Sequence, residues 1–375
     1  MRKIVILILC VWIFCPVVVN ANEIQMDTEK ELFELFEFQE MDRLLEEIFP
    51  ENKLDFKETI LGLINGDVQF TFDLIKKMIT DQFFYEFNSS KAGMIHILLI
   101  AFIAAIFHNF SSVFQNNQVS ELSFYVLYML LVTISLEGFR VLIDSVSCGI
   151  ADMLDFLKLL GPIYFLAVAI ATGSATSIAF YHLILFTIYI VEMLILNVIL
   201  PIIQIYVIVR ILNEITSEEI LSKFAELLQT IIVWSLRTLL AAVFGINVIQ
   251  GILNPAIDLV KRSILTGGGG SLPVIGNVVE GVTEIVLGTA VLIKNGIGLA
   301  GAIVCIAICI SPVIQMTIIS LMYKIMAALI QPVSDKRMVG CLSSMSDGAS
   351  LLLRILVTSC TLFLISIAMV AATTS

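Results

Sequence analysis

Long apolar segments constrain the fold of this chain more than any other feature of its sequence. The clearest one, residues 296–330, contains a single charged side chain, Lys324. Across the chain 59% of the residues are hydrophobic and 14% are charged, whereas soluble domains carry roughly 25% charged residues. Inside lipid every backbone N–H and C=O group needs a partner, and a helix supplies these partners within one segment. The sequence therefore predicts an all-α, polytopic integral membrane protein.

Seven apolar segments are long enough to cross ~30 Å of hydrocarbon, which takes roughly 20 helical residues. The predicted spans are residues 93–110, 122–137, 159–181, 183–212, 224–252, 296–330 and 351–372. Residues 141–158 place three aspartates among apolar side chains and predict an amphipathic helix in the membrane interface. A proline removes one backbone hydrogen bond from a helix. We therefore expect an interruption at Pro201 and a helix break or kink at Pro312, which is either structural or part of a substrate site.

The first 21 residues have the pattern of a secretory signal peptide. Two basic residues precede an apolar stretch, and Val19-Asn20-Ala21 places small residues at the cleavage position. An uncleaved anchor is the alternative. Residues 22–92 then form an exported, acidic segment in which apolar residues recur at helical spacing. Two roles remain open for its short helices, a cap packed on the membrane domain of residues 93–375 and a docking arm for a partner.

Two charged side chains, Glu192 and Arg237, lie deep inside predicted spans. A lone charge at that depth costs at least ~2.5–3.5 kcal/mol on insertion scales, so each needs a partner or water. One interpretation is a buried Glu192–Arg237 pair that holds two helices together. The other is a polar pathway, because further polar residues follow Arg237 along its helix: Gln229, Thr230 and Asn247.

A polar stripe also precedes the longest apolar segment, on the helix predicted for residues 274–295. It consists of Asn277, Glu280, Glu284 and Asn295, with Lys294 at its edge. The stripe indicates either a helix that lies in the membrane interface or one that lines a wet cavity or contacts another subunit. Beyond it, Gly298 and Gly301 leave one helix side without bulk, which predicts close packing against a neighbour.

Motifs for catalysis, nucleotide binding and metal binding are absent from the sequence. The four glycines at 267–270 are not followed by the lysine of a phosphate-binding loop, and they predict a flexible linker. Cys305 and Cys309 lie one helical turn apart in an apolar span and are expected to be small core residues. The net charge of −11 does not suit nucleic-acid binding. We expect no enzymatic activity, no cofactor, no metal and no nucleic-acid partner.

Several short motifs in the carboxyl-terminal half point to one family. They are Leu272-Pro273-x-x-Gly276, Leu292-Ile293-Lys294-Asn295-Gly296-Ile297-Gly298, Ser311-Pro312, Tyr323-Lys324 and Gln331-Pro332-x-x-Asp335. Together they resemble stage III sporulation protein AE of endospore-forming bacteria. The signal-like start, the exported acidic segment and the chain length agree with this resemblance, which extends over nearly the whole chain.

The resemblance implies a multi-pass protein of the mother-cell membrane that surrounds the forespore. It would act with other proteins of its operon, including an ATPase and ring-forming membrane proteins, and with a forespore-side partner. Together they would form a channel or secretion-like complex that supports forespore development. The alternative function is a stand-alone secondary transporter of a small solute, which would predict an inverted repeat with paired broken helices.

Overall fold

The computed structural model describes residues 36–373 except 37, 50–54, 65–67, 112–116, 173–174, 216–219 and 267–275. The predicted signal peptide, residues 1–21, lies outside the described residues. Every regular element in the described ranges is a helix. They are α3 (Gln39–Ile48), α4 (Phe56–Ile64), α5 (Val68–Ser111), α6 (Asn117–Thr172), α7 (Ala175–Leu194), α8 (Leu200–Ile215), α9 (Ser222–Thr266), α10 (Gly276–Ile330) and α11 (Lys336–Thr373), with a π-helical turn, η1 (Ile195–Ile199), between α7 and α8.

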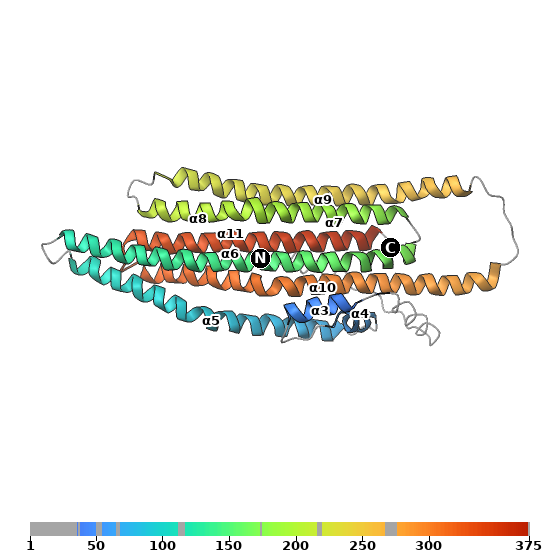
Figure 1. The fold of residues 1–375 in the computed structure, drawn as a ribbon, viewed down its shortest axis with the longest axis horizontal. Helices are drawn as coiled ribbons and strands as arrows, with labels where there is room; N and C mark the ends of the chain where they lie inside the picture. Colours follow the sequence, from blue (N-terminus) through green and yellow to red (C-terminus); the bar gives the residue numbers. More distant parts are fainter. Residues whose placement is uncertain are drawn as a thin grey trace.

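The long helices lie side by side in an elongated bundle (Figure 1). In this view α9 forms one edge, α7 and α8 come next, and α11, α6 and α10 follow in that order, with α5 at the opposite edge. The packing agrees with this order, because α10 contacts α11, α6 and α5, while α9 contacts α7, α8 and α11. The bundle therefore has α10 and α11 at its centre and α9 and α5 at its margins.

Among the described residues, six helices are long and apolar enough to cross a membrane. They are Ile79–Ile106, Tyr125–Ala171, Leu183–Ile215, Ser222–Ile246, Gly288–Ile330 and Lys336–Ala368. The chain is thus a multi-pass, all-α membrane protein. Several helices exceed the hydrocarbon thickness, since the 56 residues of α6 extend about 84 Å at 1.5 Å per residue. Part of such a helix must lie outside a layer of ~30 Å if it crosses once.

The structure replaces two predicted spans with one helix. Residues 122–137 and the described part of 159–181 up to Thr172 belong to α6, and so does the segment 141–158 that was expected to lie in the interface. The physical reason is that the segment keeps a continuous buried stripe. Its aspartates 144 and 155 are exposed, whereas Val146, Ile150 and Met153 on the other side are buried. A two-sided helix of this kind needs no break to bury its apolar face.

The predicted boundary at residue 93 also falls inside a helix. α5 runs from Val68 to Ser111 and contains no proline, so the polar Asn88-Ser89-Ser90-Lys91 stretch stays helical. One continuous helix therefore joins the segment that was predicted to be exported to the first predicted span. Among the described residues of that segment, α3 and α4 precede α5 as separate short helices.

Helices α3 and α4 pack on the membrane helices as a cap. Phe56 of α4 is fully buried and meets the ring of Phe156 of α6 edge-on, with 6.2 Å between ring centroids. Ile60 and Ile64 of α4 lie against Gly296 of α10. The Phe56 N–H donates a 3.0 Å hydrogen bond to Asp42 Oδ1, which joins α4 to α3. For these described helices the structure favours the cap over the free docking arm.

The two prolines at which an interruption or a break was predicted, Pro201 and Pro312, behave differently. The π-helical turn η1 interrupts the α-helical hydrogen-bond pattern just before Pro201, although the apolar helix Leu183–Ile215 continues through it. By contrast, α10 continues through Pro312, so the predicted break is wrong, and the alternative, a kink, stays a prediction. Neighbouring helices hold α10 on several sides, which lets it tolerate the lost hydrogen bond. Gly149 of α6 makes room for the ring, because a Cβ atom there would lie 3.1 Å from Pro312 Cγ.

Small residues bring α10 close to α6, as their spacing predicts. A Cβ atom on Gly298 would lie 2.9 Å from the Tyr164 hydroxyl oxygen, and one on Gly301 would lie 2.8 Å from a Leu160 methyl group. Larger residues at either position would therefore push the two helices apart. This close approach places side chains of α6, α10 and α11 in contact at the bundle centre.

Candidate functional site

Glu192 lies at the centre of the bundle with no solvent exposure. It is carried by the last turn of α7, just before the π-helical turn η1. Ser359 of α11 donates a 2.8 Å hydrogen bond to Glu192 Oε2. The other carboxylate oxygen, Oε1, has no hydrogen-bond partner in the described part of the chain. A buried carboxylate with one satisfied oxygen marks this position as a candidate functional site, because intramembrane acids are costly to retain.

A cluster of sulfur atoms lies beside this carboxylate. Cys360 follows Ser359 on α11, and its Sγ atom lies within 4.8 Å of the Sγ atoms of Cys305 and Cys309 on α10. Met153 of α6 adds a fourth sulfur, with its Sδ atom 3.3 Å from Cys309 Sγ. All four side chains are buried. We call Met153, Cys305, Cys309 and Cys360 the sulfur cluster.

From the sequence, Cys305 and Cys309 were predicted as small core residues and not as part of a cluster. The one-turn spacing of Cys305 and Cys309 indicated two thiols on one helix face, and both are buried as expected of small core residues. Met153 and Cys360 lie on other helices and carried no such signal. Only the packing of α6 and α11 against α10 brings them to the same point.

The predicted Glu192–Arg237 pair is not formed. Glu192 is buried and bonded to Ser359, whereas Arg237 is exposed on α9. Although α7 and α9 are in contact, Arg237 lies on the side of α9 that faces away from the bundle. The buried side of that helix is apolar and carries Ala225, Leu228, Ile232, Leu236 and Val243. The helical rotation of α9 therefore separates the two charges.

The other residues of the predicted polar pathway follow the same outer side of α9 in part. Thr230 is exposed and Gln229 is half-buried, while Asn247 lies in α9 with a side chain outside the described ones. The exposed face continues to the start of the helix, where Lys223 donates a 2.8 Å hydrogen bond to Glu226. We call Thr230, Trp234, Arg237 and Phe244, all exposed, the outer face of α9.

The polar stripe predicted on α10 divides into two parts. Asn277, Glu280 and Glu284 lie in α10, but their side chains are outside the described ones. Lys294 is fully buried, although the sequence placed it at the edge of the stripe, and Asn295 is exposed. Near this position α4 packs on α10, with Ile60 and Ile64 against Gly296. The segment is thus enclosed by other helices on the side of Lys294.

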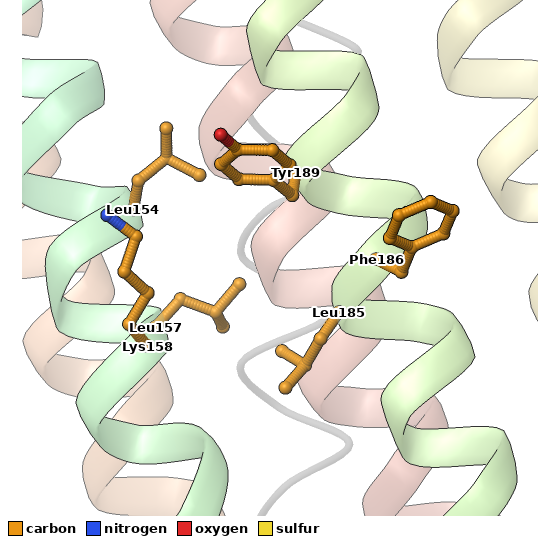
Figure 2. A pocket seen from close by; sticks show the side chains of 6 residues that line it. All are labelled: Leu154, Leu157, Lys158, Leu185, Phe186 and Tyr189. Carbon is orange, nitrogen blue, oxygen red and sulfur yellow. The ribbon is translucent and has the colours of Figure 1, made fainter.

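A groove of about 460 Å³ opens between α6 and α7 (Figure 2). It is lined by Leu154, Leu157, Lys158, Leu185, Phe186 and Tyr189. In Figure 2 the Tyr189 ring extends from α7 toward α6, whereas the Phe186 ring lies on the side of α7 that is farther from α6. Lys158 is exposed and donates a 2.7 Å hydrogen bond to Asp155. The groove lining is mainly apolar, and its chemistry suits a hydrocarbon chain or an apolar side chain better than a polar substrate.

Comparisons with known proteins identify the family. The family described as Stage III sporulation protein AE matches residues 54–374 of the chain, which include all six candidate spans. The chain belongs to the stage III sporulation protein AE family. A protein named Stage III sporulation protein AE from Bacillus subtilis (strain 168) is 28% identical over 305 residues, which cover 80% of this chain and 75% of that protein. No solved structure matches.

Membership of the stage III sporulation protein AE family assigns the chain a role in sporulation. One family-like motif, Gln331-Pro332-x-x-Asp335, forms the turn between α10 and α11 in this member. Asp335 Oδ1 accepts a 2.8 Å hydrogen bond from the Arg337 N–H and so satisfies a backbone donor at the start of α11. The Arg337 guanidinium then lies over the Tyr125 ring, 5.6 Å from its centroid. This motif ties the central hairpin to α6, which is a structural role.

Proposed function

We propose that this family member is the membrane subunit of a multiprotein channel or secretion-like complex between mother cell and forespore. It would lie in the mother-cell membrane around the forespore and support forespore development. Its partners would be an ATPase and ring-forming membrane proteins of the same operon, together with a forespore-side protein. The ATPase would supply the energy, because this chain carries no nucleotide-binding or catalytic motif.

The observation that carries the proposal is the outer face of α9. Arg237 is exposed on a helix that is long and apolar enough to cross a membrane. In a lone chain this arginine would face hydrocarbon, at a cost of roughly 2.5–3.5 kcal/mol or more. Contact with another subunit, or with water that an assembly encloses, would remove that cost. Trp234, 70% exposed, lies one turn away, and tryptophan with arginine is the combination enriched at the energetic centres of protein interfaces.

The stand-alone transporter has weaker support. That mechanism uses broken helices in corresponding positions of two repeats. The chain forms its π-helical turn before Pro201, but α10 is continuous through Pro312. The two prolines therefore do not create a matching pair of helix breaks, and the polar face of α9 points out of the bundle instead of into it.

The first experiment compares two arginines in sporulating cells of a strain that depends on this gene. Arg237→Leu is expected to reduce spore yield by about tenfold or more, since an interface arginine contributes over ~1.4 kcal/mol to association. Arg43→Leu is the matched control, because Arg43 is also exposed but lies on α3, outside the candidate spans. Immunoblots of membranes must show equal protein levels for both variants.

A second experiment tests whether the outer face of α9 meets protein. A photo-crosslinking amino acid at position 230 is expected to capture another protein of the complex or a second copy of the chain. The same group at position 102 on the exposed face of α5 serves as the comparison. Normal spore yield of Arg237→Leu, together with no protein crosslink at position 230, would contradict the proposal.

A further inference from the structure

The sulfur cluster has the composition and the geometry of a metal site. Three thiols from two helices have their Sγ atoms within 4.8 Å of one another. Metal–sulfur bonds of ~2.3 Å place sulfur atoms about 4 Å apart around one ion. The observed spacing therefore needs only a small contraction to surround an ion. Helix α10 supplies Cys305 and Cys309 on one face, and α11 closes the site with Cys360.

A fourth donor supports this interpretation independently. Met153 Sδ lies 3.3 Å from Cys309 Sγ, so a thioether from a third helix reaches the same point. A thioether is a soft ligand that binds hard cations such as Mg²⁺ and Ca²⁺ poorly, whereas thiolates with thioethers select cuprous copper. We propose that Met153, Cys305, Cys309 and Cys360 form an intramembrane binding site for Cu⁺.

The charge of the ion fits its surroundings. Binding replaces the proton of one thiol with Cu⁺, forms a copper–thiolate bond and releases the proton to water, which leaves the site neutral. A divalent ion would require two thiols to lose protons for the same neutrality. Net charge is therefore zero in either case, but Cu⁺ reaches it with one ionised thiol where a divalent ion needs two. No change in oxidation state is involved.

Glu192 adds a second buried polar group next to the cluster. Its Oε2 atom is bonded to Ser359, the residue before Cys360, and its Oε1 atom has no partner among the described residues. Through Ser359, Glu192 is held at the same turn of α11 that supplies Cys360.

The test uses the full-length protein, purified in detergent and reduced. The protein is titrated with Cu⁺ held by a coloured cuprous chelator, and the copper that the protein removes is measured. Wild-type protein is expected to bind one more equivalent than Cys360→Ala. Met153→Leu preserves size and should fold normally, yet it should weaken the competition by about tenfold or more. Cys341→Ala is the matched control, because Cys341 is a buried cysteine of α11 outside the cluster.

Each outcome has a defined meaning. Loss of one equivalent in Cys360→Ala and weaker binding in Met153→Leu, with wild-type binding in Cys341→Ala, supports the site. Equal copper binding by the wild type and both cluster variants overturns it. A site that holds Zn²⁺ in the presence of equimolar Cu⁺ overturns the assignment to copper. Size-exclusion profiles establish that each variant remains folded, so a change in binding cannot be attributed to aggregation.

Discussion

At the scale of single residues, the contribution of a buried hydroxyl group to stability depends on whether it has a hydrogen-bond partner. Ser359 and Ser366 both lie on α11 and are buried. Ser359 donates to the Glu192 carboxylate, whereas the Ser366 hydroxyl has no hydrogen-bond partner in the described part of the chain. Removing a donor leaves the acceptor unsatisfied, while removing an unpaired hydroxyl removes only its desolvation cost.

Ser359→Ala is therefore expected to lower stability by about 1–3 kcal/mol, because the Glu192 oxygen then loses its donor. Ser366→Ala should leave stability unchanged or raise it slightly. Thermal unfolding of the detergent-purified variants measures both changes, with membrane abundance as a second readout. Equal effects of the two substitutions would show that the Ser359–Glu192 bond contributes nothing.

At the scale of helices, glycine favours the fold at one position and weakens a helix at another. A Cβ atom on Gly348 of α11 would overlap a methyl group of Val207 and lie 2.9 Å from the Phe139 ring. On Gly245 of α9 a Cβ atom would meet nothing within 4 Å. The first glycine thus permits three helices to approach closely, and the second only weakens its own helix, since glycine costs about 1 kcal/mol relative to alanine.

Gly348→Ala is expected to destabilise the protein by roughly 1–3 kcal/mol, because Val207 and Phe139 must move. Gly245→Ala should be neutral or stabilising by up to ~1 kcal/mol. The transition temperatures of the two variants, measured in the same detergent, test the pair. If Gly348→Ala proved as stable as Gly245→Ala, the close packing of α11 against α6 and α8 would be refuted.

At the scale of the whole molecule, the structure packs α3 and α4, which belong to the segment predicted to be exported, against the membrane helices. α3 and α4 carry fully buried Met41, Leu45, Phe56 and Ile60, and their partners come from α6 and α10. Burial raises the pKa of Asp42, which the Phe56 N–H opposes by donating to its carboxylate. The cap therefore depends on apolar burial and on one charge-assisted hydrogen bond.

Phe56→Ala is expected to release this cap, because losing a buried phenylalanine costs about 3–5 kcal/mol. The measurement is limited proteolysis of the full chain, in which cleavage within α3 and α4 should become faster. Lys57→Ala, at the neighbouring exposed position, is the control and should be cleaved at the wild-type rate. Unchanged protection of Phe56→Ala would indicate that the cap does not rely on the contact with Phe156.

The sequence alone was enough to predict the class of protein, its helical content and its family. Hydropathy is a local property that adds along a segment, so residues 296–330 read as a membrane helix without knowledge of any neighbour. Hydropathy along the sequence did not predict that a helix continues through a polar stretch, as α6 does over residues 141–158. In that segment, the side of the helix on which a residue lies decides whether its side chain is buried, and the mean polarity of the segment does not.

The partners at the bundle centre were decided by tertiary structure. The sequence suggested Arg237 as the partner of Glu192 because opposite charges at depth attract, but α9 turns Arg237 outward and α11 presents Ser359, 167 residues away from Glu192. Cys360 and Met153 likewise join Cys305 and Cys309 only because α10 packs against both α11 and α6. Which side chains meet depends on the rotation and register of whole helices, and these follow from the packing of every residue along them.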